Sequence, residues 1–290
     1  MKFALFLGCV IPAREPSYEM SARKVAEKLG IELIDLEGAS CCGTIPIESL
    51  DFMFSTAIGA YNICLAEEMG YDLITLCSGC FQLLRKVNVK LKEDKKLRME
   101  INKILSKVGK EYKGSIVVKN FLEVLYYDLG VEKIKELVSK PLKGLKVATY
   151  YGCHLLSPSS VLKLDNPISP HLFDDLVDAT GAESVPYEYK LQCCGGLLRG
   201  ISDELGLNLA RNKFVSILEA QADCATTVCP FCFIQFEVGQ LEIKSRFKEI
   251  YDIPTLHYPQ LLGLAMGMGS RELGLHTHRI KTDSLIEKIR

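Results

Sequence analysis

The sequence predicts an α/β fold of two similar halves, each with its own parallel sheet. Three observations indicate this: strands alternate with helices, the same order of elements occurs twice, and both halves carry one cysteine pattern. The pattern is a single Cys, then Cys-Cys-Gly, then Cys-x-x-Cys, and 34 residues separate the cysteine pair from the last motif in both copies. A gap of the same length in both copies indicates internal duplication.

The first half is predicted to alternate three strands with three helices. An apolar strand begins the chain, and the helix that follows it ends at Gly30. After a second strand, a long helix separates the Cys-Cys-Gly loop from a third, short apolar strand. The predicted strands are 2–8, 31–36 and 73–76, and the predicted helices are 17–29, 49–69 and the stretch from 81 onward.

The second half repeats this order. Its first helix ends at Gly181, and its long helix again follows the Cys-Cys-Gly loop. The predicted strands are 146–151, 182–185 and 225–228, and the predicted helices are 170–179, 202–222 and 231–242. The charged stretch 86–140 is predicted to be a helical connector. We therefore expect two Rossmann-like domains, 1–143 with the connector and 144–290 with a C-terminal tail.

Ten of the twelve cysteines belong to the repeated pattern. In each half they follow the three strands in turn, so all leave from the carboxyl ends of parallel strands, where open α/β sheets bind ligands. Cys80 falls in the first turn of the next helix, whose N–H groups favour a thiolate. The first set is Cys9, Cys41, Cys42, Cys77 and Cys80, and the second is Cys153, Cys193, Cys194, Cys229 and Cys232. We expect five sulfurs to converge in each half.

Five thiolates per half favour an iron–sulfur cluster of unusual shape. A structural zinc site is closed by four ligands, and a cubane cluster also takes four cysteines. Adjacent cysteines such as Cys41 and Cys42 suit a cluster whose irons lie far enough apart for neighbouring side chains to bind different ones. A structural zinc protein stays open as the alternative. Cys64 and Cys224 lie outside the pattern and are expected to be small buried hydrophobes.

Composition excludes several classes of protein. With 290 residues, of which 48% are hydrophobic and 24% charged, the chain has room for two modest cores. No run reaches the roughly 18 consecutive apolar residues of a membrane span, and the apolar start at 3–7 is too short for a signal peptide. A formal net charge of -1 gives no reason to expect nucleic acid. We therefore expect a cytoplasmic protein, in which thiols stay reduced and cysteine patterns indicate metal binding or catalysis.

At these motifs the chain resembles the cysteine-rich CCG-domain family, best known from the B subunit of the heterodisulfide reductase of methanogenic archaea. The resemblance covers both halves. Its motifs are FLGCVIP at 6–12, SCCG at 40–43, CSGC at 77–80, YYGCH at 150–154, CCGG at 193–196 and CPFC at 229–232.

The resemblance implies a catalytic iron–sulfur subunit. It implies two noncubane [4Fe-4S] clusters, each held by the five cysteines of one half, which face each other across the domain interface. The implied substrate is the mixed disulfide of coenzyme M and coenzyme B, which is reduced to two thiols, and we expect each cluster to deliver one electron. The sequence has no dinucleotide fingerprint and no ferredoxin motif. The implied electron-donating partners, within the same reductase complex, are a flavin-containing subunit that feeds a ferredoxin-like iron–sulfur subunit.

A second function from the same family stays open. Other CCG-family subunits relay electrons in quinone-linked succinate, lactate or glycolate oxidoreductases. Two complete copies of the pattern without a fused ferredoxin segment favour the heterodisulfide reductase.

Few other residues are candidates for the chemistry. His154 directly follows a predicted ligand and is expected to protonate a leaving thiolate, with a loop histidine that only hydrogen-bonds the backbone as the equal alternative. Arg14, Lys190 and Arg199 lie close in sequence to predicted ligands and are candidates for binding the anionic groups of the substrate. His276 and His278 lack partner cysteines and are expected in a mobile surface tail.

Overall fold

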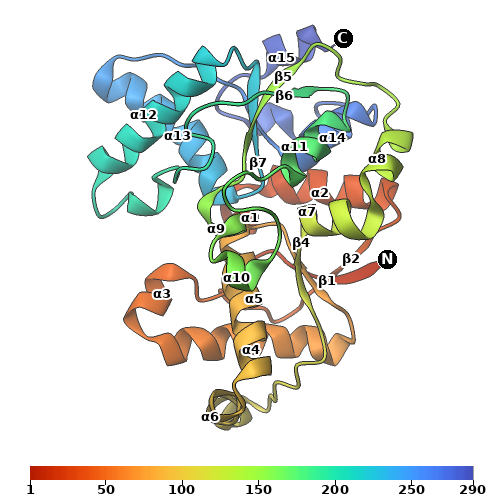
Figure 1. The fold of residues 1–290 in the computed structure, drawn as a ribbon, viewed down its shortest axis with the longest axis vertical. Coiled ribbons are helices and arrows are strands. Elements are labelled where there is room, and N and C mark those ends of the chain that lie inside the picture. The colour runs from red at the N-terminus through yellow and green to blue at the C-terminus, as the bar shows by residue number, and fades with distance from the viewer. Residues whose placement is uncertain (290) are drawn as a thin grey trace.

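Two parallel four-stranded sheets form the framework of the computed structural model, which describes residues 1–289 (Figure 1). Their strand orders are β2-β1-β3-β4 and β6-β5-β7-β8, so the second sheet repeats the topology of the first. The first strand of each half therefore lies inside its sheet, between the second and the third. This topology confirms the predicted α/β fold with two similar halves and parallel sheets.

The first half surrounds its sheet with helices on both faces. Its strands are β1 (Lys2–Phe6), β2 (Glu32–Asp35), β3 (Leu73–Thr75) and β4 (Val118–Asn120). Its helices are α1 (Val10–Arg14), α2 (Pro16–Lys28), α3 (Ile45–Leu50), α4 (Phe52–Met69), α5 (Ser78–Glu93), α6 (Lys95–Leu105), α7 (Phe121–Glu123) and α8 (Val131–Leu137). A π-helix at Val124–Leu129 continues α7.

The second half has the same plan. Its strands are β5 (Lys146–Tyr150), β6 (Glu183–Ser184), β7 (Cys224–Thr227) and β8 (Thr255–His257). Its α-helices are α9 (Cys153–Leu156), α10 (Ser159–Leu162), α11 (Leu172–Asp178), α12 (Asp203–Glu219), α13 (Pro230–Phe247), α14 (Tyr258–Ala265) and α15 (Asp283–Lys288). Within the described chain, no helix combines the length and the apolar character needed to cross a membrane.

Apolar side chains on both faces hold the central strands in place. Ala4, Leu5 and Phe6 of β1 are fully or almost fully buried, as near-continuous apolar runs in parallel sheets are. Ala4 lies opposite Ile34 of β2 and Leu73 of β3. The register is therefore set by burial, and it aligns the carboxyl ends of the strands at one edge of the sheet.

The helix predicted at 49–69 is interrupted at Asp51. This residue has an extended backbone, with φ -149° and ψ 102°, and separates α3 from α4. Its carboxylate accepts a hydrogen bond of 2.9 Å from the N–H of Phe54, which caps α4. A cap of this kind contributes about 1 kcal/mol to helix stability. The capping preference of Asp51 is the sequence signal for this break.

Each sheet also contains a fourth strand that the sequence analysis did not identify. In the stretch 86–140, β4 pairs with β3, and Val118 lies opposite Leu73. In the second half, β8 pairs with β7 in the equivalent position. The stretch 86–140 is therefore more than a helical connector, because it completes the first sheet.

The C-terminal segment packs on the protein, contrary to the expectation of a mobile tail. Leu273, Leu275 and Leu285 are buried. His278 is half-buried, and its Nε2 lies 2.9 Å from the side-chain nitrogen of Gln260. His276 alone is exposed, as expected for a surface histidine.

The two halves pack on each other through reciprocal contacts. Helix α1 of the first half contacts α13 of the second, and the equivalent α9 of the second half contacts α5 of the first. Figure 1 shows the second half above the first, with α9 and α10 descending onto α5. Reciprocal contacts between equivalent elements are those that an approximate two-fold axis produces.

Candidate functional site

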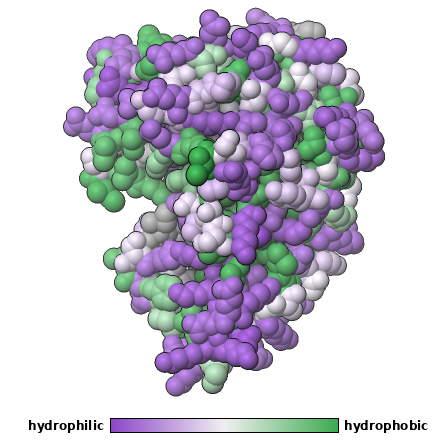
Figure 2. Space-filling view, viewed as in Figure 1, coloured by the Kyte–Doolittle hydropathy of each residue, from purple (hydrophilic) through white to green (hydrophobic). Residues whose placement is uncertain are grey.

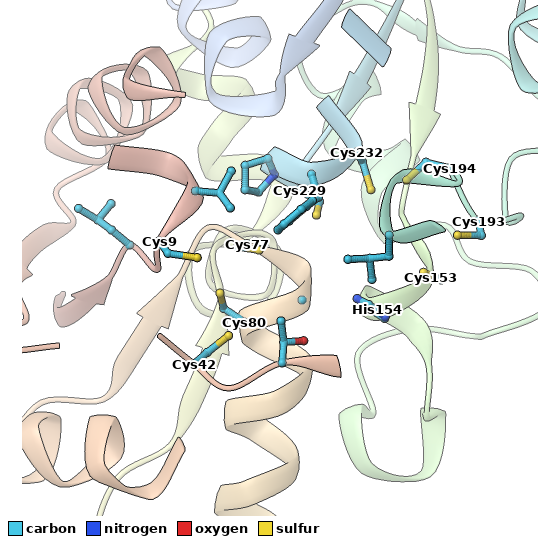
Figure 3. A pocket seen from close by; sticks show the side chains of 17 residues that line it. Cys9, Cys42, Cys77, Cys80, Cys153, His154, Cys193, Cys194, Cys229 and Cys232 are labelled. Atoms are coloured by element: carbon cyan, nitrogen blue, oxygen red, sulfur yellow. The ribbon is translucent and has the colours of Figure 1, made fainter. Parts of the chain in front are cut away.

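Nine of the ten cysteines in the repeated pattern line one cavity between the two halves (Figure 3). The tenth, Cys41, lies in an adjoining pocket, which Cys9 also lines. Figure 3 shows the first-half cysteines on one side of the cavity and most of the second-half cysteines on the other, with Cys77 and Cys229 between them. The structure therefore brings together residues that lie more than 200 positions apart in the chain, since Cys9 and Cys232 line the same cavity.

The sheets and the helices that follow them place these cysteines. Cys77 is the N-cap of α5 and Cys229 is the N-cap of α13, directly after β3 and β7. Cys80 and Cys232 occupy the first turns of the same helices, as predicted for Cys80. Helix N-termini present free N–H groups and a partial positive charge, so they favour thiolates.

Hydrogen bonds between side chains join nine of the ten cysteines into one chain, from which only Cys9 is left out. Within the first half, Cys42 contacts Cys41 and Cys80, and Cys80 contacts Cys77. The order of the chain is Cys41, Cys42, Cys80, Cys77, Cys229, Cys232, Cys194, Cys193 and Cys153. The link between the halves is the contact of Cys77 with Cys229.

Hydrogen bonds from neighbouring thiols lower the pKa of three of these sulfurs. Hydrogen bonds from Cys41 and Cys80 lower the pKa of Cys42 to about 4. Hydrogen bonds from Cys153 and Cys194 lower the pKa of Cys193 to about 2.

The third of these sulfurs is that of Cys229. Hydrogen bonds from Cys232 and Cys77 hold its pKa well below the usual range. The neighbouring donor thiols have raised pKa values, because each gives its proton to a sulfur beside it. The cavity thus stabilises negative charge on sulfur at three separate points.

Backbone N–H groups of the two Cys-Cys-Gly loops also point at sulfur. The N–H of Gly43 donates to Cys41 Sγ at 3.4 Å, and the equivalent N–H of Gly195 donates to Cys193 Sγ at 3.3 Å. Gly196 donates likewise to Cys194 Sγ at 3.3 Å. Hydrogen bonds of this kind stabilise anionic sulfur whether it is a free thiolate or a metal ligand.

The glycine before the first cysteine of each set permits a close approach of the chain to another sulfur. Gly8 has φ +71°, and a Cβ at this position would lie 3.0 Å from Cys80 Sγ. The equivalent Gly152 has φ +73°, and a Cβ there would lie 3.5 Å from Cys232 Sγ. A side chain at Gly8 would be strained by the backbone and would displace Cys80.

His154 lies in the cavity wall and faces the first half across the interface (Figure 3). A Cβ on Gly79 of the CSGC motif would come within 3.5 Å of His154 Nδ1. Burial lowers the pKa of His154, while the thiolates of Cys229 and Cys193 oppose this shift. Within residues 1–289, no hydrogen bond engages either ring nitrogen. The alternative of a loop histidine that hydrogen-bonds backbone therefore has no contact in its favour.

The rest of the cavity wall is mostly apolar. Leu7 and Val10 flank Cys9 on one side, and Leu197, Pro230 and Phe231 line the other. Sequence reasoning missed these residues, although each lies within three positions of a predicted ligand. Among the described residues, no lysine or arginine lines the cavity.

The surface between the two halves is also rich in apolar side chains. Figure 2 shows a notch at the left between the halves, with apolar side chains above and below it. The exposed apolar residues on that side include Leu50 in α3 and Phe54 in α4. They also include Ile201, just before α12, and Leu205 in its first turn.

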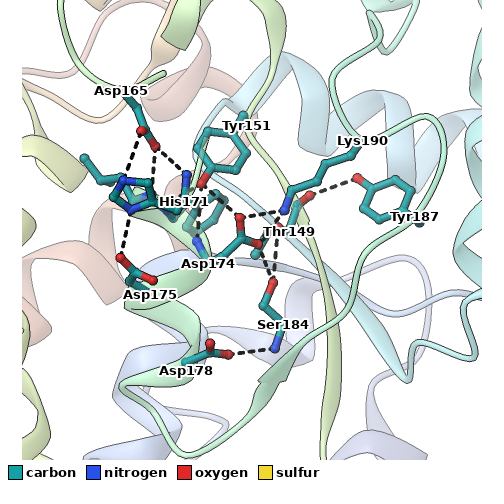
Figure 4. Close-up of polar contacts among 12 residues, drawn as sticks. Thr149, Tyr151, Asp165, His171, Asp174, Asp175, Asp178, Ser184, Tyr187 and Lys190 are labelled. Atoms are coloured by element: carbon teal, nitrogen blue, oxygen red, sulfur yellow. Dashed lines mark hydrogen bonds and ion pairs between the residues drawn. The ribbon is translucent and has the colours of Figure 1, made fainter. Parts of the chain in front are cut away.

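The three basic residues proposed from the sequence do not reach the cavity. Lys190 Nζ lies 2.6 Å from both carboxylate oxygens of Asp174 (Figure 4). Arg199 pairs with Asp203 and Glu242. Arg14 lines a separate pocket. Their proximity to the cysteines in sequence is thus not matched by proximity in the cavity, and two of them are occupied by carboxylates.

Cys64 and Cys224 lie outside the chain of sulfurs, as predicted. Both are buried in the apolar core, with 1% and 0% of their surface exposed. Burial raises the pKa of Cys64 to about 12 and that of Cys224 further. They are packing residues.

The cysteines do not resemble a site for a single metal ion. Within the described residues, no three Cys, His, Asp or Glu side chains are grouped with the geometry of such a site. The sulfurs instead extend as a chain across the interface, with anionic sulfur stabilised on both sides of it. A donor set made of ten cysteines suits soft, multinuclear groups such as iron–sulfur clusters.

Comparisons with known proteins agree with the duplicated pattern. A model of the CCG cysteine-rich domain family matches residues 3–85 and 147–237. The chain is 41% identical over 292 residues to the B subunit of the ferredoxin/F(420)H(2)-dependent CoB-CoM heterodisulfide reductase of Methanosarcina acetivorans, a match that covers 99% of this chain and 97% of that protein.

Two further proteins extend the comparison. The chain is 34% identical over 284 residues to the 8-methylmenaquinol:fumarate reductase membrane anchor subunit of Wolinella succinogenes, covering 98% of this chain and 99% of that protein. Among solved structures, a hypothetical protein from Helicobacter pylori has a similar fold, with a TM-score of 0.76 and 21% identity. That match covers 97% of this chain and 52% of the Helicobacter pylori chain.

Proposed function

The chain belongs to the cysteine-rich CCG-domain family, and we propose that it is the disulfide-reducing subunit of a heterodisulfide reductase. The observation that carries this proposal is the continuous chain of cysteines that lines one cavity and crosses from one half to the other. The similarity to the B subunit of the Methanosarcina acetivorans reductase supports the substrate, the mixed disulfide of coenzyme M and coenzyme B.

The cysteines fit iron–sulfur clusters as the resident cofactors. We propose two noncubane [4Fe-4S] clusters, one for each half. The first would be held by Cys9, Cys41, Cys42, Cys77 and Cys80, and the second by Cys153, Cys193, Cys194, Cys229 and Cys232. When bound, the clusters supply one electron each to the sulfur–sulfur bond.

The reaction consumes two electrons and two protons for each disulfide. The sulfur–sulfur bond breaks, and each sulfur leaves as a thiol after one electron and one proton have reached it. The apolar wall formed by Leu7, Val10, Leu197 and Phe231 contacts the disulfide and excludes water from it. A substrate between the two cysteine sets is thereby oriented with one sulfur toward each half.

His154 is the proton donor in this proposal. Its ring lies in the cavity wall beside the thiolates of Cys229 and Cys193, and both ring nitrogens are available in the described structure. Negative charge that develops on a leaving sulfur attracts a proton to the imidazole, which then donates it to that sulfur. The proton for the other sulfur comes from solvent at the mouth of the cavity.

The electrons come from partner proteins of the same complex. We propose that a ferredoxin-like iron–sulfur subunit is the direct electron donor and that a flavin-containing subunit supplies it with electrons, because iron–sulfur proteins transfer single electrons.

The two units of the chain, 1–143 and 144–290, each contribute one cysteine set. None of the twelve cysteines of the described structure forms a disulfide. This condition favours the cytoplasm as the compartment.

A second candidate function rests on a specific relative. The similarity to the 8-methylmenaquinol:fumarate reductase subunit of Wolinella succinogenes supports an electron-transfer role in a quinone-linked oxidoreductase. In that case the same cysteines would hold a relay, and the cavity would not bind a disulfide.

A thiol-release assay separates these two functions. Iron-loaded protein would be mixed anaerobically with a reduced one-electron dye and the coenzyme M and coenzyme B heterodisulfide, and the free thiols would be counted against the dye oxidised. We expect two thiols for each two electrons. Iron-loaded protein that exchanges electrons with a menaquinone analogue but leaves the heterodisulfide intact would support the relay.

A further inference from the structure

The second half contains a buried cation for which the proposed function gives no role. Lys213 lies in the middle of α12 and is 0% exposed. Its Nζ donates a hydrogen bond to the carbonyl of Tyr189 and lies 4.3 Å from the centre of the Tyr150 ring and 5.9 Å from that of Tyr187. Within residues 1–289, no carboxylate forms an ion pair with it.

An unpaired ammonium group in a protein interior needs compensation. Burial lowers the pKa of Lys213 to about 8, and the sulfurs of Cys194 and Cys232 are the leading groups that oppose this shift. One carbonyl and two aromatic faces only partly replace the water that the ammonium loses. Tyr150, whose ring lies against the Lys213 ammonium, donates its hydroxyl hydrogen to the carbonyl of Gln192, directly before Cys193. Lys213 is therefore linked through one aromatic side chain to the second cysteine set, and an anionic group held by that set would balance its charge.

Among the described side chains of the first half, no lysine or arginine is buried in this way. The equivalent position is Tyr61, which precedes Lys213 by 152 residues, as Cys42 precedes Cys194. Tyr61 donates its hydroxyl hydrogen to the carbonyl of Gly38 at 3.3 Å, before the cysteine pair, as Lys213 donates to the carbonyl of Tyr189. The two residues therefore make comparable hydrogen bonds, but only Lys213 adds a charge.

We propose that Lys213 is a positioning residue whose fixed positive charge raises the reduction potential of the group held by the second cysteine set. This inference rests on the proposal that both sets hold iron–sulfur clusters. Reduction adds one negative charge to such a cluster, and a buried cation nearby favours the reduced state. The duplicated halves are then unequal, and the second half is the stronger electron acceptor.

A difference in reduction potential between the two sides would direct electron flow. With the same ligands on both sides, two unperturbed clusters would have similar reduction potentials. An electron would then have no preference for either cluster. Lys213 lowers the free energy of an electron on the second side, so a single electron shared between the two sides would favour the half that also carries His154. Charge and proton donor thus lie on the same side.

Anaerobic redox titration of the variants tests this role without any turnover. Lys213→Met removes the charge but keeps a long side chain, Lys213→Arg keeps the charge, and Tyr61→Phe is the matched change in the first half. Electron paramagnetic resonance would follow the midpoint potential of each centre. Iron content and thermal unfolding would be measured on the same samples.

We expect Lys213→Met to shift one of the two centres to lower potential by at least a tenfold change in its reduction equilibrium, about 59 mV for one electron. The other centre should stay unchanged, Lys213→Arg should restore the wild-type value, and Tyr61→Phe should shift neither. A Lys213→Met protein with full iron and two unchanged potentials would overturn the proposal.

The test also covers a variant that does not fold and a wild-type protein that does not release thiols. If Lys213→Met does not fold, Lys213→Gln takes its place, because the amide still donates to Tyr189 without a charge. The potentials are measured in the absence of heterodisulfide, so a wild-type protein that fails to release thiols would refute the proposed substrate while leaving the role of Lys213 to be judged on its own.

Discussion

Cys77 and Cys229 occupy equivalent positions in the two halves, and their side chains hydrogen-bond to each other across the interface. Next to them, Ser78 Oγ donates to the carbonyl of Val228 at 3.3 Å. Equivalent residues can touch only close to the axis that relates the two halves. The remaining cysteines must then lie on opposite sides of this axis, so a ligand in the cavity faces both sets.

Iron binding should depend on cysteines of the pattern and not on other buried cysteines of the same half. Cys42→Ala removes a sulfur of the chain, whereas Cys64→Ala removes a thiol packed in the apolar core. We expect Cys42→Ala to lose about half of the iron after anaerobic reconstitution, because only one of two clusters is affected. Cys64→Ala should keep all of it, and equal iron in both variants would contradict the assignment.

Gly8 should be required for the first set of cysteines. In Gly8→Ala the new Cβ would lie 3.0 Å from Cys80 Sγ, whereas in Gly30→Ala, at nearly the same φ, nothing lies within 4 Å. Both variants should lose about 1 kcal/mol of stability because of the positive φ. Only Gly8→Ala should also lose iron. The check is iron content and thermal unfolding on both, and iron retained by Gly8→Ala would show that Cys80 is not constrained by this glycine.

His154 should affect the rate of thiol release but not the iron content. We expect His154→Gln to lower the rate about 100-fold or more, because the leaving sulfur loses its proton donor. His171→Gln is the control, since that ring is 63% exposed and lies 3.0 Å from Asp175, far from the cysteines in sequence. The measurement is steady-state thiol release on iron-matched samples. An unchanged rate in His154→Gln would assign both protons to solvent.

Glu237 on α13 should make the stability depend on pH. Burial raises the pKa of its carboxyl from 4.5 to about 7. The hydrogen bonds from the N–H groups of Arg279 and Ile280 lower this pKa but do not offset the effect of burial. The nearby Glu15 raises this pKa and Arg279 lowers it. Because the folded-state pKa lies above the unfolded one, this contribution favours folding most below about pH 4.5 and is lost as the pH rises toward 7.

Glu237→Gln keeps an acceptor for these N–H groups without the charge. At pH 8 we expect its free energy of unfolding to exceed that of the wild type by up to about 3 kcal/mol, with a correspondingly higher unfolding temperature. At pH 5 the difference should be much smaller, because the Glu237 carboxyl is then largely protonated in the folded protein. Glu132→Gln, at a side chain that is 84% exposed, is the control and should change neither value. A difference that is the same at both pH values would contradict this role for Glu237.

The fold could be predicted where local signals are strong. The apolar runs of β1 and β5 and the glycines after the first helices fixed the order of the elements. The three-residue strands β4 and β8 could not be found in this way, because their sequences VKN and TLH lack a periodic pattern. Their place is determined by pairing with strands far away in the chain, such as Val118 with Leu73.

The site was predictable to a similar extent. Parallel strands bring their carboxyl ends to one edge, so the convergence of the cysteines follows from topology. The pairing of Lys190 with Asp174 and of Arg199 with Glu242 could not be predicted, because these carboxylates lie 16 and 43 residues away in sequence, although Asp203, the other partner of Arg199, lies only four residues away. Sequence proximity to a ligand says little about a long, flexible side chain. The burial of Lys213 could not be predicted from the sequence for the same reason.

The central claim is that two iron–sulfur clusters act directly on the heterodisulfide. The measurement that tests it most directly is iron and sulfide analysis of the anaerobic protein, combined with electron paramagnetic resonance of the oxidised protein before and after addition of coenzyme M or coenzyme B. We expect about eight irons per chain and a paramagnetic signal that appears only with a thiol. Stoichiometric zinc without visible absorption, or full iron loading without any response to either thiol, would contradict the claim.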